Sequence, residues 1–147
     1  MKHTKQMPRT TPLFFPLLFA AGAVSYYTLE ILFRGFSHWT MAICGGLCLC
    51  LIFEINRAFS TRSLLLRALL GALTITVVEF FTGCIVNLGL HWNVWDYSHL
   101  PFHILGQISL TFSSLWFLLC IPICFGCSAL EKVCFSKSKG KTQKGSL

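Results

Sequence analysis

The stretch from Leu64 to Leu90, LLLRALLGALTITVVEFFTGCIVNLGL, decides the fold class of this chain. Its only charged residues are Arg67 near the beginning and Glu79 near the centre. A helix needs about 20 mostly apolar residues to cross a hydrocarbon core of about 30 Å, so this stretch is long enough to span a membrane. An acid at mid-membrane depth costs about 2.5 to 3.5 kcal/mol on insertion scales, which predicts that Glu79 has a buried partner and a purpose.

The composition of the whole chain also indicates a membrane protein. Of 147 residues, 54% are hydrophobic and 12% are charged, and the mean hydropathy is +0.67. In a typical soluble domain about 25% of the residues are charged. We therefore expect lipid to be the main solvent of one bundle without an internal linker.

Four segments are apolar and long enough to be membrane spans. The predicted spans are residues 13–33, 39–56, 64–90 and 104–130. Only helices and closed barrels satisfy their backbone groups inside lipid, so we predict an all-α, polytopic integral membrane protein with four transmembrane helices. The beginning of the chain also resembles a signal peptide that would end near residue 23, but the apolar run continues to Phe33 and favours a retained helix.

The basic residues predict the orientation. With both ends cytoplasmic, every Lys and Arg except Arg34 lies on or near the inner face, as the positive-inside rule requires. Residues 1–12 are then a cytoplasmic segment, and residues 131–147 are a disordered basic tail attracted to anionic lipid headgroups. Because topology explains the net charge of +7, no nucleic-acid partner is expected.

The cysteines indicate neither disulfides nor a metal site. Seven of the eight lie within predicted spans, and Cys120, Cys124 and Cys127 share a helix face with a spacing that suits small packing residues. In the loop from His91 to His103, the histidines and Asp96 match no usual ligand spacing. We expect no metal and no cofactor.

The third span carries a stripe of small and polar residues at intervals of three or four positions. The stripe consists of Ala72, Thr76, Glu79, Gly83 and Asn87. Such a stripe should face protein, and Gly45 and Gly46 on the second span are its expected mates, unless it faces a neighbouring subunit. We therefore interpret Gly45, Gly46 and Gly83 as helix-packing residues. Glu79 is either a protonated packing group or a proton or cation site.

A second polar cluster is predicted at the outer face. Glu30 and Arg34 have the spacing of an ion pair at the end of the first span, Gly35 suits a helix C-cap, and Ser37 can cap the next helix. The expected outer cluster is Glu30, Arg34, His38, Asp96 and His99. Ion-pair anchoring is one interpretation of this cluster, and catalysis with His38 and Asp96 as candidates is the other.

The loop between the third and fourth spans, His91 to His103, is rich in aromatic residues. Its Trp92, Trp95 and Tyr97 suit the headgroup region, so we expect much of the loop to be interfacial. Pro101 fits the first turn of the fourth helix.

Several strings of the sequence together carry a family resemblance. They are EILFRGFSHWTM at residues 30–41, GGLC at 45–48, TVVEFFTG at 76–83, Asn87, NVWDY at 93–97 and LGQI at 105–108. The chain resembles, over about residues 26–122, the bacterial putative ABC transporter permease family of the CmpB type. The resemblance implies a multi-span helical fold in a bacterial cell membrane and a transport role, with no established substrate. The chain departs from the family pattern at His99 and His103, where Asn is frequent, which weakens a shared zinc site.

A permease of this type would need a separate ATPase subunit, because the chain contains no ATP-binding motif. The inner loop around Arg57 to Ser63 offers little surface for docking such a subunit. We nevertheless keep the ATPase as a partner to be tested.

Three functional hypotheses remain open. In the first, the chain is a permease-like or transport-associated subunit in which Glu79, Asn87 and Gln107 line a polar path, completed by a homo-oligomer or a larger membrane complex. In the second, it is a membrane-embedded enzyme or sensor that acts on a lipid or envelope precursor through the outer cluster. In the third, it is an accessory subunit that only packs against a larger partner. The transport hypothesis is preferred to an enzyme.

Overall fold

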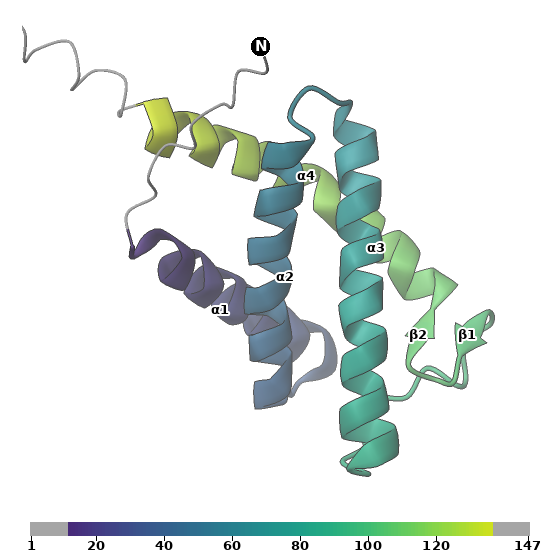
Figure 1. Ribbon diagram of the computed structural model, residues 1–147. Coiled ribbons are helices and arrows are strands. Elements are labelled where there is room, and N and C mark those ends of the chain that lie inside the picture. The colour runs from purple at the N-terminus through teal and green to yellow at the C-terminus, as the bar shows by residue number, and fades with distance from the viewer. Residues whose placement is uncertain (1–11, 137–147) are drawn as a thin grey trace, which may run out of the picture.

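The computed structural model describes residues 12–136 of the chain (Figure 1). The expectations for residues 1–11 and 137–147 lie outside this range. Within the described residues, four helices are long and apolar enough to cross a membrane. The prediction of an all-α polytopic membrane protein with four spans is therefore confirmed, whereas the orientation of its ends stays a prediction.

The helices begin and end close to the predicted positions, with one exception at the fourth. They are α1 from Phe14 to Arg34, α2 from Trp39 to Ala58, α3 from Leu64 to Gly83 and α4 from Leu110 to Ser136. A π-helical segment, η1, continues α3 from Cys84 to Gly89. Together α3 and η1 cover nearly the whole stretch of 64–90.

Local capping explains most of the helix ends. Gly35 adopts φ 79° after α1 and donates its N–H to the Ile31 carbonyl at 2.7 Å, as expected of a glycine C-cap. The prediction that Ser37 caps α2 is wrong. His38 is the N-cap and accepts from the Thr40 N–H through Nδ1 at 3.4 Å, while the Ser37 hydroxyl donates to Glu30.

The fourth helix begins six residues later than predicted, because residues 103–109 form a hairpin. Strand β1, His103–Ile104, pairs antiparallel with β2, Ile108–Ser109. Between them Leu105 and Gly106 have φ values of 51° and 69°, which no right-handed helix accommodates. Ser109 then caps α4, its Oγ accepting from the Phe112 N–H at 3.3 Å.

Two further boundaries of the fourth span differ from the prediction. Pro101 lies in a turn before β1 and not in the first turn of α4. At its other end α4 continues to Ser136, so residues 131–136 are helical and not part of a tail. Hydropathy averaged over a window cannot distinguish an apolar hairpin from the first turn of an apolar helix, so it misplaced the start.

The helices pack in the order α1, α2, α3, α4. In Figure 1 α2 and α3 lie side by side, α1 lies against α2, and α4 crosses behind α3. Where α1 meets α2 the backbones approach closely, since a Cβ added to Gly22 would lie 2.6 Å from the Gly45 carbonyl oxygen. The two outer helices, α1 and α4, leave most of their residues exposed to the surroundings.

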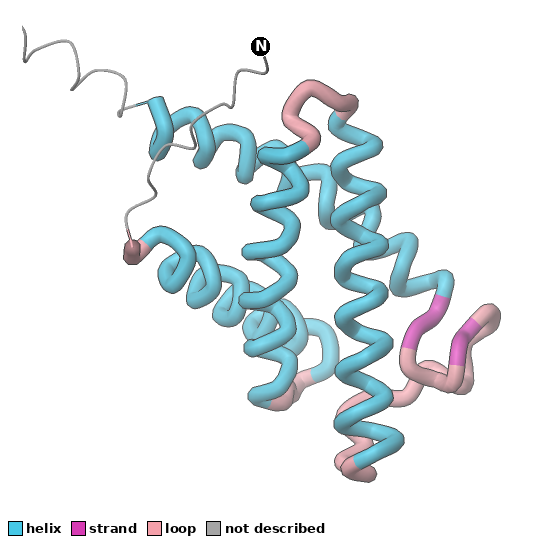
Figure 2. The backbone as a smooth tube through the Cα atoms, viewed as in Figure 1, coloured by secondary structure: helices cyan, strands magenta, loops and turns pink. Residues whose placement is uncertain are grey.

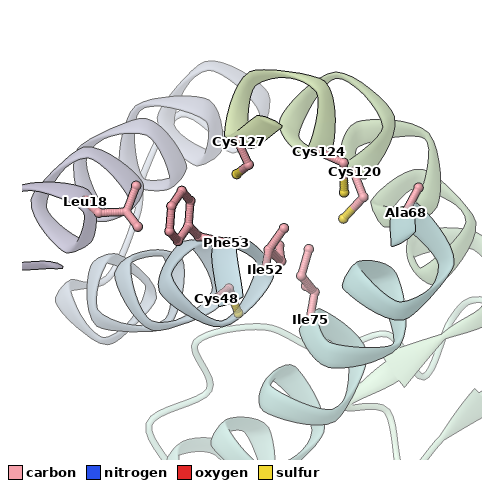
Figure 3. Packing of buried hydrophobic residues seen from close by; sticks show 9 residues of the cluster. All are labelled: Leu18, Cys48, Ile52, Phe53, Ala68, Ile75, Cys120, Cys124 and Cys127. Carbon is pink, nitrogen blue, oxygen red and sulfur yellow. The ribbon is translucent and has the colours of Figure 1, made fainter. Parts of the chain in front are cut away.

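A core of apolar side chains joins all four helices. Figure 3 shows its buried members: Leu18, Cys48, Ile52, Phe53, Ala68, Ile75, Cys120, Cys124 and Cys127. Three of these are the α4 cysteines, which occupy the core as the small packing residues that their spacing predicted. The core lies toward the end of the bundle that contains the α2–α3 connection. The polar groups around Glu79, described next, lie toward the opposite end.

Candidate functional site

Glu79 is buried on α3 and accepts two hydrogen bonds. The Tyr97 hydroxyl donates to its Oε1 at 2.8 Å, and Trp116 Nε1 donates to its Oε2 at 3.0 Å. Only 5% of Glu79 is exposed, so these bonds replace the water that the carboxyl would otherwise bind. The partners belong to the α3–α4 loop and to α4, and hold these two elements against α3.

Aromatic rings surround this carboxyl. The Tyr97 ring stacks on Phe112 with centroids 4.5 Å apart and planes inclined by 15°, and Trp116 lies 5.9 Å from Tyr26 of α1. Burial raises the pKa of the Tyr97 phenol above its ordinary value, and the neighbouring Glu79 raises it further. The phenol therefore stays neutral at physiological pH and keeps the proton that it donates to Glu79.

The stripe on α3 faces α4 and the loop, not α2. Thr76 Oγ1 lies 3.0 Å from Ser113 Oγ of α4, and a Cβ on Gly83 would overlap the Gln107 side chain. The expectation that the stripe packs on Gly45 and Gly46 is therefore wrong.

Both α2 glycines instead meet α1. A Cβ on Gly45 would overlap Tyr26, and one on Gly46 would lie 2.8 Å from the Phe19 ring. Small residues permit close approach by any helix. The sequence therefore shows that such a face is covered without showing which helix covers it.

Asn87 and Gln107 link the loop to η1, the π-helical continuation of α3. Asn87 Nδ2 donates to Gln107 Oε1 at 2.8 Å, and Asn87 Oδ1 accepts from the Val94 N–H at 2.7 Å. Trp95 Nε1 donates to the Gln107 carbonyl oxygen at 3.0 Å. Gln107 lies in the loop and not on the fourth helix, where the sequence placed it. Its amide and that of Asn87 are engaged with protein, which suits bracing better than lining a path.

Arg34 connects the end of α1 to the same loop. Its Nη1 donates to Glu30 Oε1 at 2.8 Å, and its Nη2 donates to the Val94 carbonyl oxygen at 2.6 Å. The ion pair expected from the spacing is thus present, and the Ser37 hydroxyl also donates to the Glu30 carboxylate. Glu30 is buried, so this charge is compensated by both an ion pair and a hydroxyl donor.

The structure divides the outer cluster that the sequence predicted. Glu30, Arg34, Asp96 and His99 line one cavity, but His38 does not. The His38 ring lies 5.5 Å from Trp92, and its Nδ1 lies 2.8 Å from Thr40 Oγ1.

Asp96 forms a local turn. Its carboxylate accepts from the Ser98 N–H and the Ser98 hydroxyl, each at 2.8 Å, and these bonds lower its pKa. Asp96 is exposed and is one of the residues that line the cavity.

The cavity is a groove bounded by α1, α4 and the loop, and we call it the lateral groove. It has a volume of about 500 Å³, with apolar walls that include Leu29, Phe33, Leu115 and Leu119. A second cavity of about 180 Å³ adjoins it and includes Glu79 in its lining, and the two share Tyr26, Leu29, Trp116 and Leu119. Asn87 and Gln107 line neither of these two cavities. Among the described residues, no group of three His, Cys, Asp or Glu side chains is placed to hold a metal ion.

A third polar cluster, which the sequence did not indicate, lies at the opposite end of the bundle. Arg67 Nη1 donates to Asn56 Oδ1 at 2.8 Å and to Ser128 Oγ at 2.9 Å, and Asn56 Nδ2 donates to Ser128 Oγ at 3.0 Å. It joins α2, α3 and α4. Sequence reasoning counted Arg67 only as a positive charge near the membrane boundary. Arg67 lies one turn inside an apolar stretch, and this position could have indicated that its side chain faces the interior of the bundle.

The chain was compared with protein-family models, with curated proteins and with solved structures. Residues 17–144 match the family model described as Putative ABC-transporter type IV, which confirms the resemblance found in the sequence. Neither the curated proteins nor the solved structures gave a match.

Proposed function

We propose, because the chain belongs to the Putative ABC-transporter type IV family, that it is a permease-like subunit whose lateral groove holds an amphiphilic substrate. Family membership and four apolar helices make the chain a multi-pass membrane protein associated with transport. The proposal adds a bacterial cell membrane, both termini in the cytoplasm, and the groove as the place where substrate binds.

The shape and lining of the lateral groove carry the proposal. Its volume of about 500 Å³ falls within the usual range of ligand sites, about 300 to 1,000 Å³. It lies between α1 and α4, which pack mainly on α2 and α3 respectively. A molecule dissolved in the bilayer could therefore enter from the side.

The distribution of polar groups favours an amphiphile. Glu30, Arg34, Asp96 and His99 are among the lining residues, whereas Leu115 and Leu119 offer only apolar contact. Ligand sites commonly combine apolar walls with a few placed polar groups. We assign the polar head of the substrate to the side of Asp96 and His99, and its apolar part to the α4 wall.

The hydrogen bonds of Glu79 connect the lateral groove to the adjoining cavity. Its two donors, Tyr97 and Trp116, both line the lateral groove, while Glu79 itself lines the adjoining cavity. Occupation of the groove would therefore act on the hydrogen bonds of a buried carboxyl. This replaces the simpler picture of a path lined by Glu79, Asn87 and Gln107.

The enzyme hypothesis finds less support in the geometry. Its two candidates were His38 and Asp96, but His38 caps α2 beside Trp92 while Asp96 lies at the lateral groove. A general acid and base must both reach the reacting group. The observed arrangement does not bring these two residues to one site.

Labelling with a photoactivatable phospholipid that carries a diazirine in its acyl chain tests the proposal. Leu115→Trp fills the lateral groove, and Leu118→Trp is the matched control, because Leu118 is 60% exposed on α4 but lines neither cavity. We expect labelling at groove residues, mapped by mass spectrometry, to fall several-fold in Leu115→Trp and to persist in Leu118→Trp. Equal labelling of these residues in both variants and the parent protein would contradict the proposal.

Partners belong to the same proposal. We expect a homo-oligomer or a larger membrane complex, with a separate ATPase as the source of energy. The α2–α3 connection, residues 59–63, is short, so such an ATPase would need further surface from another subunit. Mass spectrometry of the complex purified in mild detergent tests this, and a monomer without associated ATPase would count against a coupled permease.

A further inference from the structure

We propose that the hairpin before α4 anchors the loop in the bilayer, at the boundary between headgroups and acyl chains. The anchoring side chains are Phe102, Ile104 and Leu105, which we call the hairpin anchor. This inference concerns a surface outside the lateral groove and does not depend on the proposed function.

The loop turns back alongside the helices. Gln107 packs on Gly83, which is six residues before the end of η1 at Gly89. The base of the hairpin therefore lies beside the helix, inside its end, and not beyond it.

The packing of α2 on α3 indicates a similar depth for the base of the hairpin. Cys44 of α2 lies 3.2 Å, Sγ to Oγ1, from Thr82, and Cys44 is five residues inside the start of α2 at Trp39. Figure 2 shows the two strands beside the lower part of α3 and not beyond its end. If α2 and α3 span the membrane, the hairpin therefore lies at the level of the boundary between headgroups and acyl chains.

The hairpin anchor is apolar and uncovered. Phe102 is 80% exposed, Leu105 is 62% exposed and Ile104 is 56% exposed. Phe102 and Leu105 also have φ values of 54° and 51°, a conformation that is uncommon for bulky residues. Burying these side chains in lipid would remove their apolar surface from water, which is favourable.

The polar groups of the hairpin are largely satisfied from within. The Phe102 carbonyl accepts from the Leu110 N–H at 3.2 Å, and the Ile104 and Leu105 carbonyls accept from the Gln107 backbone N–H and side-chain Nε2. The Gly106 N–H donates to His103 Nδ1 at 3.2 Å. Non-helical backbone is costly in contact with lipid unless its groups are paired. The hairpin meets this requirement at boundary depth, where interfacial elements bury their apolar side by about 5 to 10 Å.

Exposed aromatic residues at the same end of the bundle make lipid the expected occupant. Phe36, Trp39 and Trp92 are 60%, 57% and 46% exposed. They lie in the α1–α2 connection, at the start of α2 and after η1, which is where an aromatic belt meets the headgroups. The hairpin anchor continues this belt around the loop.

Fluorine NMR on the full chain in phosphatidylethanolamine–phosphatidylglycerol vesicles tests the inference. Trifluoromethylphenylalanine is introduced singly at Phe102, at Thr61 in the exposed α2–α3 connection, and at Leu118 on the exposed face of α4. Dissolved oxygen relaxes probes in lipid, and a nickel chelate relaxes probes in water. Since Phe102 is 80% exposed, the substitution should not disturb folding.

We expect the oxygen-to-nickel relaxation ratio at position 102 to approach that at Leu118 and to exceed that at Thr61 several-fold. A ratio equal to that at Thr61 would place the hairpin in water and overturn the inference. Protection from both reagents would show that protein, such as a second copy of this chain, covers the hairpin anchor, and would equally overturn it.

Discussion

The Tyr97 hydroxyl donates a 2.8 Å hydrogen bond to Oε1 of Glu79, a residue eighteen positions earlier in the chain. Trp116 satisfies the other carboxylate oxygen. This relationship ties the loop to the last turns of α3 and connects the lateral groove to the adjoining cavity. It also explains how an acid within an apolar helix is tolerated, because both its oxygens have donors.

Replacing Tyr97 with Phe should destabilise the fold by about 1 to 3 kcal/mol, since Glu79 Oε1 then loses its donor while remaining buried. Reversible unfolding in mixed detergent micelles measures the change. The control is Tyr27→Phe, because Tyr27 is partly exposed, at 37%, on α1, and its effect should stay within about 0.5 kcal/mol. Equal effects of both substitutions would show that the hydrogen bond from Tyr97 to Glu79 does not stabilise the fold.

The stabilisation by Tyr97 should also depend on alkaline pH. Burial raises the pKa of this phenol in the folded protein, so the neutral form is favoured by folding. Its contribution is fully present below the ordinary pKa of about 10 and declines as pH rises above that value. The difference in unfolding free energy between the parent and Tyr97→Phe should therefore be smaller at pH 11 than at pH 9. An equal difference at these two pH values would contradict the raised pKa of Tyr97 in the folded protein.

Glu79→Gln should preserve the fold while removing the ionisable group. The amide oxygen of Gln can accept from Trp116 Nε1, and its nitrogen can donate to the Tyr97 hydroxyl oxygen. We expect a change in unfolding free energy of less than about 1.5 kcal/mol and normal abundance in the membrane. Glu79→Ala, which loses both interactions, should be clearly less stable.

The same pair of variants tests the role of Glu79 in transport. If Glu79→Gln inserts normally and leaves growth phenotypes and measured fluxes intact, its ionisable group has no part in transport. Loss of function at normal abundance would support a role for that group.

Gly83→Ala should be destabilising by about 1 to 3 kcal/mol, because the added methyl group overlaps Gln107 and lies 3.0 Å from Trp95 Cζ2. Gly126→Ala on α4 is the matched control, since nothing lies within 4 Å of a Cβ there. This control should be neutral or stabilise the helix by up to about 1 kcal/mol. The opposite order of the two variants would show that Gly83 does not seat Gln107.

Asn56→Ala should weaken the contact among α2, α3 and α4. Asn56 is 1% exposed and bonds both Arg67 and Ser128, so its removal leaves polar groups with fewer partners at a cost of about 1 to 3 kcal/mol. Thermal unfolding in detergent measures the loss. Glu54→Gln, at a partly exposed ion pair with Arg57, should cost less than about 1 kcal/mol, and a larger effect there than at Asn56 would refute the assignment.

The site could be predicted from the sequence only where its contacts are local. The Glu30–Arg34 pair and the Gly35 cap followed from spacings of a few residues. The partners of Glu79 did not, although Tyr97 and Trp116 were visible in the sequence, because many aromatic residues could have reached a buried carboxyl. The assignment of the α3 stripe to Gly45 and Gly46 failed for a similar reason, since several small faces were compatible.

The sequence by itself determined that this is a four-span helical membrane protein with a buried acid on its third span. Transfer free energies and short-range spacing suffice for that, because each span is apolar enough to enter lipid as a helix on its own. Only the tertiary structure decided that the loop folds back along α3, that α4 begins at Leu110, and that α1 and α4 leave a lateral groove between them. Those features depend on contacts between residues far apart in the chain, such as Gln107 with Gly83 and Arg34 with Val94. Their energies differ between alternative packings in ways that hydropathy and helical periodicity do not register.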